Sequence, residues 1–482
     1  MTTLDTQIPD ASRLRLRGDA ARAQSAGPLL VLFIITILTP ASFELAGFLL
    51  SPNRLFLLVA TVPFALKVMS GQAGRFTIVD LFFLLHGVWI IISLTVIEGA
   101  ARIPFAGITA VELTGGYFVG RVLVQDAKGY RRLFRILLIA LLVLMPFVLI
   151  ELMTGKLVIP DLLRPVFETP YRGRSAYGRL GMERVYGVFD HPILWGLFCS
   201  LTLANFVALA RGNLFKIGMG VGLSLFTTMM ALSSAPLLAC LLQLGLLGWG
   251  WVMGGRWKTL LIITTVLYVG IDLLSARTPV TILIDTLTFN PLTGYTRIAI
   301  FDAGWAAVQS SPIFGIGFND WPRPSWLTSS VDNFWLLTAM RYGMVGSFLL
   351  MVAFVAHIWL LSRVTLADPE VAAIRIGHAV ALAGISLTMV TVHIWGTMSV
   401  FTMFYLGAGA WIYASPQAAT APDAAEAMAG PPPPAQGARY SRFAPRGRDE
   451  AARPATPLVR PKPAPAQGPR YSNTTPRKDS TS

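Results

Sequence analysis

Asp332 and Asn333 lie side by side where a polar stretch of the chain meets a long apolar run. A carboxylate at such a junction can exchange a proton with a bound molecule. Arg341 lies about two helical turns into the run, where an arginine is costly unless it faces a partner or a water-filled cavity. Gly343 and Gly346 then predict close helix packing. The alternative is that Asp332 and Asn333 only cap a helix.

A second segment, around His191, combines an arginine with a helix start. Arg184 precedes a glycine–aromatic turn, and Asp190, His191 and Pro192 then open an apolar run. Pro192 fits the first helical turn, and Asp190 is the expected cap. A helix start therefore explains Asp190 and Pro192 but leaves Arg184 unexplained. His191 is either a second candidate for proton transfer or a structural histidine.

A third segment opens with Arg297 and continues with apolar residues at helical spacing. Ser311 and Pro312 end this run, and Gly315 and Gly317 predict a tight connection behind it. We expect a short amphipathic helix that lies at the membrane surface.

The composition indicates what must position these residues. The chain has 482 residues, of which 54% are hydrophobic and 13% are charged, whereas soluble domains carry roughly 25% charged residues. Apolar runs of about 20 residues recur along the chain. We expect an all-α polytopic membrane bundle of about twelve transmembrane helices over residues 28–414, after an N-terminal segment 1–27. A disordered, Pro-rich basic tail is expected over residues 415–482.

The distribution of basic residues orients these helices. The formal net charge is +14, but the lysines and arginines gather in short loops and in the tails, so nucleic acid is not the expected partner. Both termini are therefore expected in the cytoplasm, with the loops 153–186 and 275–331 on the opposite side. The first of these loops carries Arg164, Arg172, Arg174, Arg179 and Arg184. A polyanionic ligand would explain them, and the alternative is a folded loop that translocates whatever its charge.

Motifs of soluble enzymes are absent from the sequence. No Walker loop, dinucleotide-binding glycine motif, H-E-x-x-H, paired C-x-x-C or G-x-S-x-G is present. ATP-driven transport, dehydrogenase chemistry and zinc-dependent hydrolysis therefore have no support. Cys199 and Cys240 both lie in apolar runs, and we interpret them as packing residues rather than as a disulfide or metal ligands. Neither a metal nor a cofactor is expected.

The order of these motifs resembles that of a known family. An arginine precedes G-x-F-x-H-P, a second arginine precedes S-P-I-x-G-x-G, and D-N-x-x-L with G-x-x-G follows, from Arg184 to Gly346. This order resembles the O-antigen ligase and polymerase family of polytopic membrane glycosyltransferases. In the ligases a histidine usually precedes the asparagine of the third motif, whereas this sequence has Asp332. The segment F-D-H-P-I and the hairpin at Ser233–Pro236 are more similar to the branch that polymerises exopolysaccharide repeat units.

The resemblance implies a GT-C-like fold and a site at the periplasmic face of the bacterial inner membrane, with the loop 275–331 between the ninth and tenth spans. The donor would be an undecaprenyl-diphosphate-linked oligosaccharide, and no metal or nucleotide would be required. Asp332 would be the general base, with His191 as its rival. The diphosphate would be bound by Arg184 and Arg297. The further substrate-binding candidates are Arg341, Arg172, Arg174, Arg179 and Asn333.

One other activity and two other classes of protein stay open. A close alternative is a ligase that joins polysaccharide to a lipid core. A different class is a transporter or flippase of lipid-linked sugars, but the sequence shows no clear duplication between its halves, as transporters often do. A third reading is a scaffold that recruits partners through the tail. In each case we expect the lipid bilayer as surroundings and other proteins of polysaccharide export and chain-length control as candidate partners.

Overall fold

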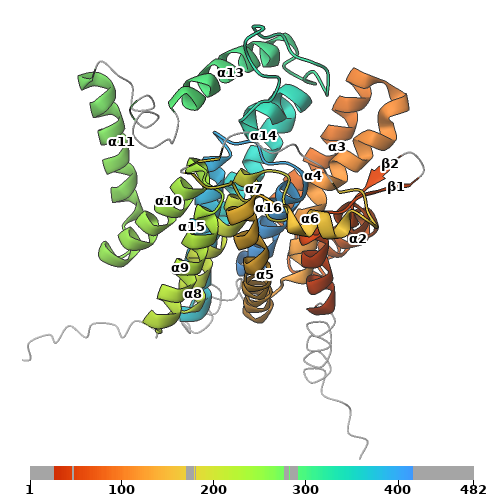
Figure 1. Ribbon diagram of the computed structural model, residues 1–482. Coiled ribbons are helices and arrows are strands. Elements are labelled where there is room, and N and C mark those ends of the chain that lie inside the picture. Colours follow the sequence, from red (N-terminus) through yellow and green to blue (C-terminus); the bar gives the residue numbers. More distant parts are fainter. Residues whose placement is uncertain are drawn as a thin grey trace, which may run out of the picture. The chain divides into compact units, whose positions relative to one another are not determined.

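The computed structural model describes residues 27–45, 48–169, 178–179, 181–275, 282 and 291–415 (Figure 1). These residues belong to Met1–Met428, the first of two units into which the chain divides. The second unit, Ala429–Ser482, lies outside the described residues, together with residues 1–26 and the rest of the expected tail from 416. Two expected site residues, Arg172 and Arg174, also lie outside them.

The described part of the chain is helical apart from its loops and one two-stranded antiparallel sheet. In chain order its elements are the helix Gly27–Leu38, β1 (Phe43–Leu45), β2 (Phe48–Leu50), α2 (Pro52–Met69), α3 (Ile78–Glu98), the 3-10 turn η1 (Ala100–Arg102), α4 (Ile103–Leu123), α5 (Ala127–Thr154), α6 (Val158–Leu163), α7 (Pro192–Ser200), α8 (Thr202–Leu209), α9 (Leu214–Met229), α10 (Ser234–Val252), α11 (Trp257–Leu274), α13 (Pro291–Ser310), α14 (Phe334–Arg363), α15 (Pro369–Thr388), α16 (Gly396–Gly409) and α17 (Trp411–Ala414).

Eight of the described helices are long and apolar enough to cross a membrane. They are α2, α3, α5, the joined pair α7 and α8, α10, α11, α14 and α15. The helix Gly27–Leu38 and α9 are apolar but shorter. Each apolar run that the sequence analysis expected to span contains at least one helix. The helical, membrane-type architecture is therefore confirmed, while the number of spans stays a prediction.

The expected first span, residues 28–50, is wrong in its second half. Its helix ends at Leu38, because the following Thr39 precedes Pro40 and a residue before proline avoids helical geometry. The chain continues into the antiparallel hairpin of β1 and β2. Glu44 pairs with Leu49 on this hairpin and is exposed.

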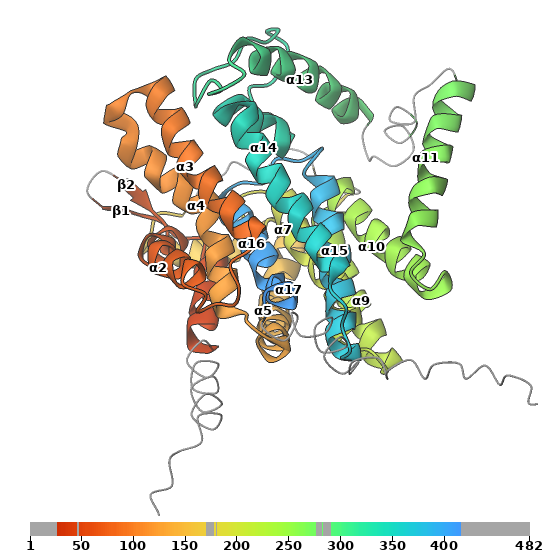
Figure 2. The same cartoon turned by 180° about the vertical axis from the view of Figure 1, so that it is seen from behind.

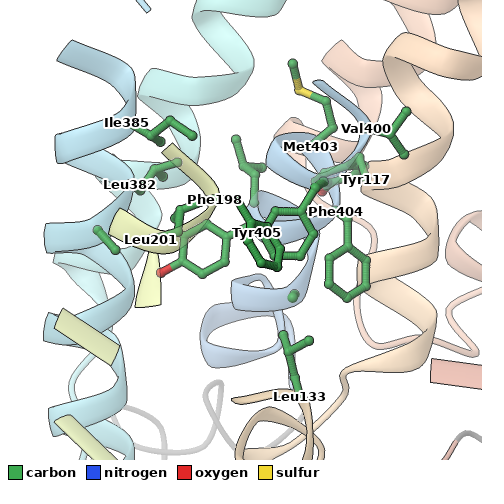
Figure 3. Packing of buried hydrophobic residues seen from close by; sticks show 14 of the residues in the cluster. Tyr117, Leu133, Phe198, Leu201, Leu382, Ile385, Val400, Met403, Phe404 and Tyr405 are labelled. Carbon is green, nitrogen blue, oxygen red and sulfur yellow. The ribbon is translucent and has the colours of Figure 1, made fainter. Parts of the chain in front are cut away.

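The bundle packs around α16, which is buried along most of its length (Figure 3). Its closest partner is α4, because glycines remove the side chains between the two backbones. A Cβ on Gly116 would lie 2.3 Å from the Val400 carbonyl oxygen, and one on Gly120 would lie 2.2 Å from that of Phe404. The glycines of α4 make its sequence a weak candidate for a span, but they allow this backbone contact.

A chain of buried polar groups links five helices within the bundle. Tyr130 donates its hydroxyl proton to Asn205 Oδ1 at 2.6 Å, so His378 Nδ1, at 3.1 Å, must donate to Tyr130. The Nε2 atom of His378 is then an acceptor, and His357 Nε2 donates to it across 3.0 Å. His357 Nδ1 in turn accepts from Tyr413 at 2.8 Å. The hydrogen bonds thus assign one tautomer to each imidazole, and this fixes the register between α5, α8, α14, α15 and α17.

Arg121, in the last turn of α4, lies inside the bundle. Its Nε donates to Asp80 Oδ1 at 2.8 Å, and both side chains are fully buried. Tyr117 donates to the same carboxylate oxygen at 2.7 Å, and Arg121 Nη1 donates to the Ala73 carbonyl at 3.0 Å. These bonds satisfy a buried ion pair that would otherwise be expensive to desolvate.

The contact between α4 and α16 predicts a specific sensitivity to side-chain size. We expect Gly120→Ala to lower the thermal unfolding midpoint of the detergent-purified protein, because its methyl group would overlap backbone atoms of α16. Overpacking of this kind typically costs about 1–3 kcal/mol. Gly107→Ala on the same helix is the matched control, because a Cβ there meets no atom within 4 Å. Equal midpoints for the two variants would show that the close contact does not exist.

Candidate functional site

A cavity of about 780 Å³ lies where the loop before α14 meets the loop between α15 and α16. Four of the expected site residues line it: His191, Arg297, Asp332 and Arg341. The rest of the wall consists of Ile193, Ile316, Gly317, Phe318, Asn319, Asp320, Trp321, Ser329, Ser330, Val331, Leu337, Met340, Val392, His393 and Trp395. Both views of the fold show α13 next to the first part of α14, and the two helices are in contact (Figures 1 and 2).

The cavity depends on a break in α14 at Gly343, where φ is 73° and ψ is 175°. The loop that follows α13 fills this break. Ile316 N donates to the Met340 carbonyl at 2.6 Å, Gly317 N donates to that of Arg341 at 3.1 Å, and Met344 N donates to that of Pro312 at 2.8 Å. Backbone groups that an unbroken helix would pair internally are thus satisfied by the loop.

Glycines make this insertion possible. A Cβ on Gly343 would lie 1.8 Å from the Ile313 carbonyl oxygen, and one on Gly315 would lie 2.5 Å from that of Met340. The segment that contains Gly315 and the segment that contains Gly343 therefore pack directly against each other. The expectation of helix packing holds for Gly346, whose Cβ would approach Trp89 of α3 to 3.1 Å. It is wrong for Gly343, which breaks the helix.

Asn333 caps α14, and this leaves Asp332 for another role. The Asn333 side chain accepts from Leu336 N at 3.0 Å. The Asp332 carboxylate lies 3.4 Å from Arg297 Nε as an ion pair, and its side chain is 46% exposed. The alternative that Asp332 and Asn333 only cap the helix therefore holds for Asn333 and is wrong for Asp332. Its carboxylate faces the cavity and partly neutralises Arg297.

Arg341 is the less compensated of the two arginines in the cavity. Its guanidinium lies 4.4 Å from the centre of the Phe318 ring. No carboxylate of the described residues forms an ion pair with it. Phe318 is itself fixed, because its backbone N–H donates to Glu98 Oε1 at 2.8 Å. The arrangement holds a guanidinium ready for an anion that enters the cavity.

Three rings of the cavity wall, His393, Trp395 and His191, form a row that the buried Phe334 ring continues behind the wall. From Phe334 to His191, the successive ring centres are 6.0, 5.7 and 5.8 Å apart. His191 also caps α7, since its Nδ1 accepts from Ile193 N at 3.2 Å. In the neutral ring the proton then lies on Nε2, which suits hydrogen-bond donation better than proton abstraction. The expectation that Asp190 caps this helix is wrong.

His393 is a cavity residue that the sequence analysis had grouped with packing histidines. Burial and then the charge of Arg341 lower its pKa to about 3, so its ring is neutral in the empty cavity. Its one sequence signal was its position between two long apolar runs, shortly before Trp395 and Gly396.

Arg184 and Arg179 do not line the cavity. Arg184 Nε donates to the Ala231 carbonyl at 3.3 Å, and Arg179 Nη1 donates to that of Leu232 at 2.8 Å. Both therefore hold the turn between α9 and α10. Burial and then the charge of Arg179 lower the pKa of Arg184 to about 10. Burial and then the charge of Arg297 lower the pKa of Arg179, so positive charge extends from the cavity towards this turn.

Glu151, at the end of α5, was also missed. Its carboxylate accepts from Tyr186 N at 2.7 Å and from Gly187 N at 3.1 Å. Glu151 therefore fixes the glycine–aromatic turn that precedes His191. No sequence pattern connects the two segments. The other carboxylate that had no expected role, Glu112, forms an ion pair with Arg54 at 2.6 Å.

The comparisons with known proteins identify no relative. No protein-family model matches the chain, and a search of curated proteins gave no match. Within the described ranges, no group of three or more His, Cys, Asp and Glu side chains is arranged to hold a metal ion. The side chains of the site bring two carboxylates, two guanidiniums and two imidazoles to one cavity.

The broken helix predicts that Gly343 tolerates no side chain. We expect Gly343→Ala to lower the thermal unfolding midpoint and to speed protease cleavage in residues 311–331, since the new methyl group would displace the inserted loop. An alanine at positive φ adds roughly 1–2 kcal/mol of strain. Gly270→Ala in α11 is the control, because a Cβ there meets nothing within 4 Å. Unchanged cleavage in Gly343→Ala would contradict the proposed dependence of the loop on the break.

Proposed function

We propose that this chain is a membrane glycosyltransferase that polymerises oligosaccharide repeat units linked to a polyprenyl diphosphate. The observation that carries the proposal is the meeting of Asp332, Arg297 and Arg341 in one cavity at the ends of apolar helices. Such a donor needs a cationic site for its diphosphate next to an apolar path for its lipid. A cavity between polar loops and membrane-type helices offers both.

The diphosphate is the leaving group, so the site must stabilise negative charge as it develops. Arg341 is suited to this task, because it has no carboxylate partner among the described residues. Guanidinium groups bind phosphate oxygens through paired, charge-assisted hydrogen bonds. Arg297 and the Nε2–H of His191 are further donors in the same wall. Arg184 and Arg179 contribute from outside the cavity, through their positive charge.

Asp332 is the proposed general base. It takes the proton of an acceptor hydroxyl while the hydroxyl oxygen forms a bond to the anomeric carbon of the donor. The bond between that carbon and the phosphate oxygen breaks, and its electron pair leaves with the polyprenyl diphosphate. Attack opposite the leaving group inverts the anomeric centre. Binding of a diphosphate at Arg297 would weaken the ion pair with Asp332 and so make the carboxylate a stronger base.

The proposed location is the periplasmic face of the bacterial inner membrane, with both termini in the cytoplasm. The pattern of basic loops supports this orientation. The lipid-linked oligosaccharide and the bilayer are the proposed partners, together with proteins of polysaccharide export and chain-length control. Ligation to a lipid core is the close alternative. The presence of Asp332 rather than histidine before Asn333 favours polymerisation.

A transporter of lipid-linked sugars is the second candidate, and the break in α14 is the observation that favours it. Transporters use broken helices to bind charged groups, usually near the middle of the membrane and in both halves of the fold. Here the cavity is lined mainly by the loops at residues 316–321, 329–332 and 392–395. A site at helix ends suits interfacial chemistry better than passage through the bundle.

The proposal predicts the effect of Asp332→Asn in a strain that lacks the native protein. This variant leaves the cap residue Asn333 in place and removes the base. We expect polymer formation to fall by about 10²–10⁴-fold, with single lipid-linked repeat units accumulating at the outer face of the membrane. Profiling of lipid-linked oligosaccharides measures both effects.

Asp302→Asn is the matched control for that experiment, because Asp302 is an exposed carboxylate on α13 outside the cavity lining. It should leave the polymer unchanged. Normal polymer length and yield in Asp332→Asn would remove Asp332 from the mechanism. Repeat units that accumulate at the inner face would instead favour the transporter.

A further inference from the structure

His393 is held in the cavity wall by its ring faces rather than by its nitrogen atoms. It lies in the connection between α15 and α16, and its ring stacks against those of Phe334 and Trp395, with ring centres 6.0 and 5.7 Å away. Its Nδ1 is buried and has no hydrogen-bond partner among the described residues. A buried polar atom without a partner is costly unless it serves a purpose. The connection is fixed nearby, because Phe334 N donates to the Met389 carbonyl at 3.0 Å.

The charges that surround His393 cancel except for one. Asp332, before α14, forms an ion pair with Arg297 of α13. Asp320, in the loop after α13, pairs with Arg323. His191, before α7, is neutral in the tautomer that its cap bond requires. Of the charged groups lining the cavity, Arg341 of α14 is therefore the one that no described carboxylate compensates.

The same surroundings determine the charge of His393. Burial and the nearby charge of Arg341 lower its pKa to about 3. An anion bound at Arg341 would compensate that repulsion and add attraction of its own. A close opposite charge raises a pKa by about 1–3 units. Two negative charges beside Arg341 would therefore bring His393 within reach of protonation at mildly acidic pH, whereas no proton is bound in the empty cavity.

We propose that Arg341 and His393 form an anion subsite for a diphosphate, in which His393 takes up a proton when the diphosphate binds. This inference rests on the proposed function and specifies how its donor is held. Arg341 supplies one permanent charge, and the imidazolium of His393 supplies a second that exists only while the anion is present. The subsite thereby favours a doubly charged diphosphate over a singly charged phosphate diester.

The sign of the linkage gives the test. Because the pKa of His393 is higher in the complex than in the empty cavity, binding must strengthen as the pH falls through the pKa of the complex. With one linked proton the affinity changes by at most about tenfold per pH unit. The probe is a diphosphate diester with farnesyl on one phosphate and glucose on the other, whose charge is constant over the range used.

Isothermal titration calorimetry of the full-length protein in detergent, in pairs of buffers with different ionisation enthalpies, measures the protons taken up. We expect close to no proton uptake near pH 8 and an uptake that rises towards one proton per bound diester as the pH falls to 5 and below. His393→Gln keeps a polar side chain of similar size but does not titrate, and it should take up fewer protons on binding than the parent protein. Arg363→Lys, at the far end of α14, is the control and should behave as the parent protein.

The buffer pairs test the parent protein directly, so the inference is testable even if His393→Gln does not fold. Binding of the diester that depends on Arg341 but involves no proton at any pH would overturn the inference and leave the proposed function standing. Equal proton uptake in the parent protein and in a folded His393→Gln would also overturn it. Absence of diester binding would contradict both proposals. A normal polymer in Asp332→Asn would contradict the proposed function alone.

Discussion

The geometry of the candidate site depends on the break of α14 at Gly343. An unbroken helix would pair its own backbone groups and exclude the loop that follows α13. With the break present, Ile316 and Gly317 donate to carbonyls of the first segment of α14, and Met344 donates back to the loop. The insertion brings Phe318 over Arg341 and closes one side of the cavity. A local departure from helical geometry thus positions a loop that begins about 30 residues earlier in the chain.

Charge compensation gives this cavity its chemical character. Asp332 is partly exposed and is paired with Arg297, so a ligand can compete for either group. Arg341 has an aromatic neighbour instead of a carboxylate among the described residues. His393 is neutral because of its surroundings. An empty cavity with one uncompensated cation attracts an anion, and the groups already present respond to it. These groups suit the diphosphate that we propose as the ligand.

Several features were predictable because they depend on local sequence. Apolar runs of sufficient length specify the helices, and four of the expected site residues meet in the cavity. The misses depend on contacts between distant segments. Gly343 resembles a packing residue until the carbonyl of Ile313 is found against it. Arg184 resembles a ligand until its bond to the turn before α10 is seen.

Glu151 and His393 are two residues whose roles could not be predicted, because these roles also depend on distant segments. Each lies at or beyond a helix end, where one polar residue is unremarkable in sequence. Glu151 becomes informative through its two bonds to the turn before His191. His393 becomes informative through the charge of Arg341 and the rings on its faces. The turn is far from Glu151 in sequence, and Arg341 is far from His393, so no local pattern could have indicated these roles.

We propose that the cavity is catalytic and opens on the non-cytoplasmic side of the membrane, where a lipid-linked oligosaccharide is available after export. Ser330 is exposed in the wall of the cavity, and Ser362 is exposed at the other end of α14. The native cysteines Cys199 and Cys240 are both buried, which limits background labelling. A membrane-impermeant maleimide applied to intact spheroplasts should label Ser330→Cys but not Ser362→Cys. Labelling of Ser362→Cys alone, with Ser330→Cys reached only after permeabilisation, would contradict the account.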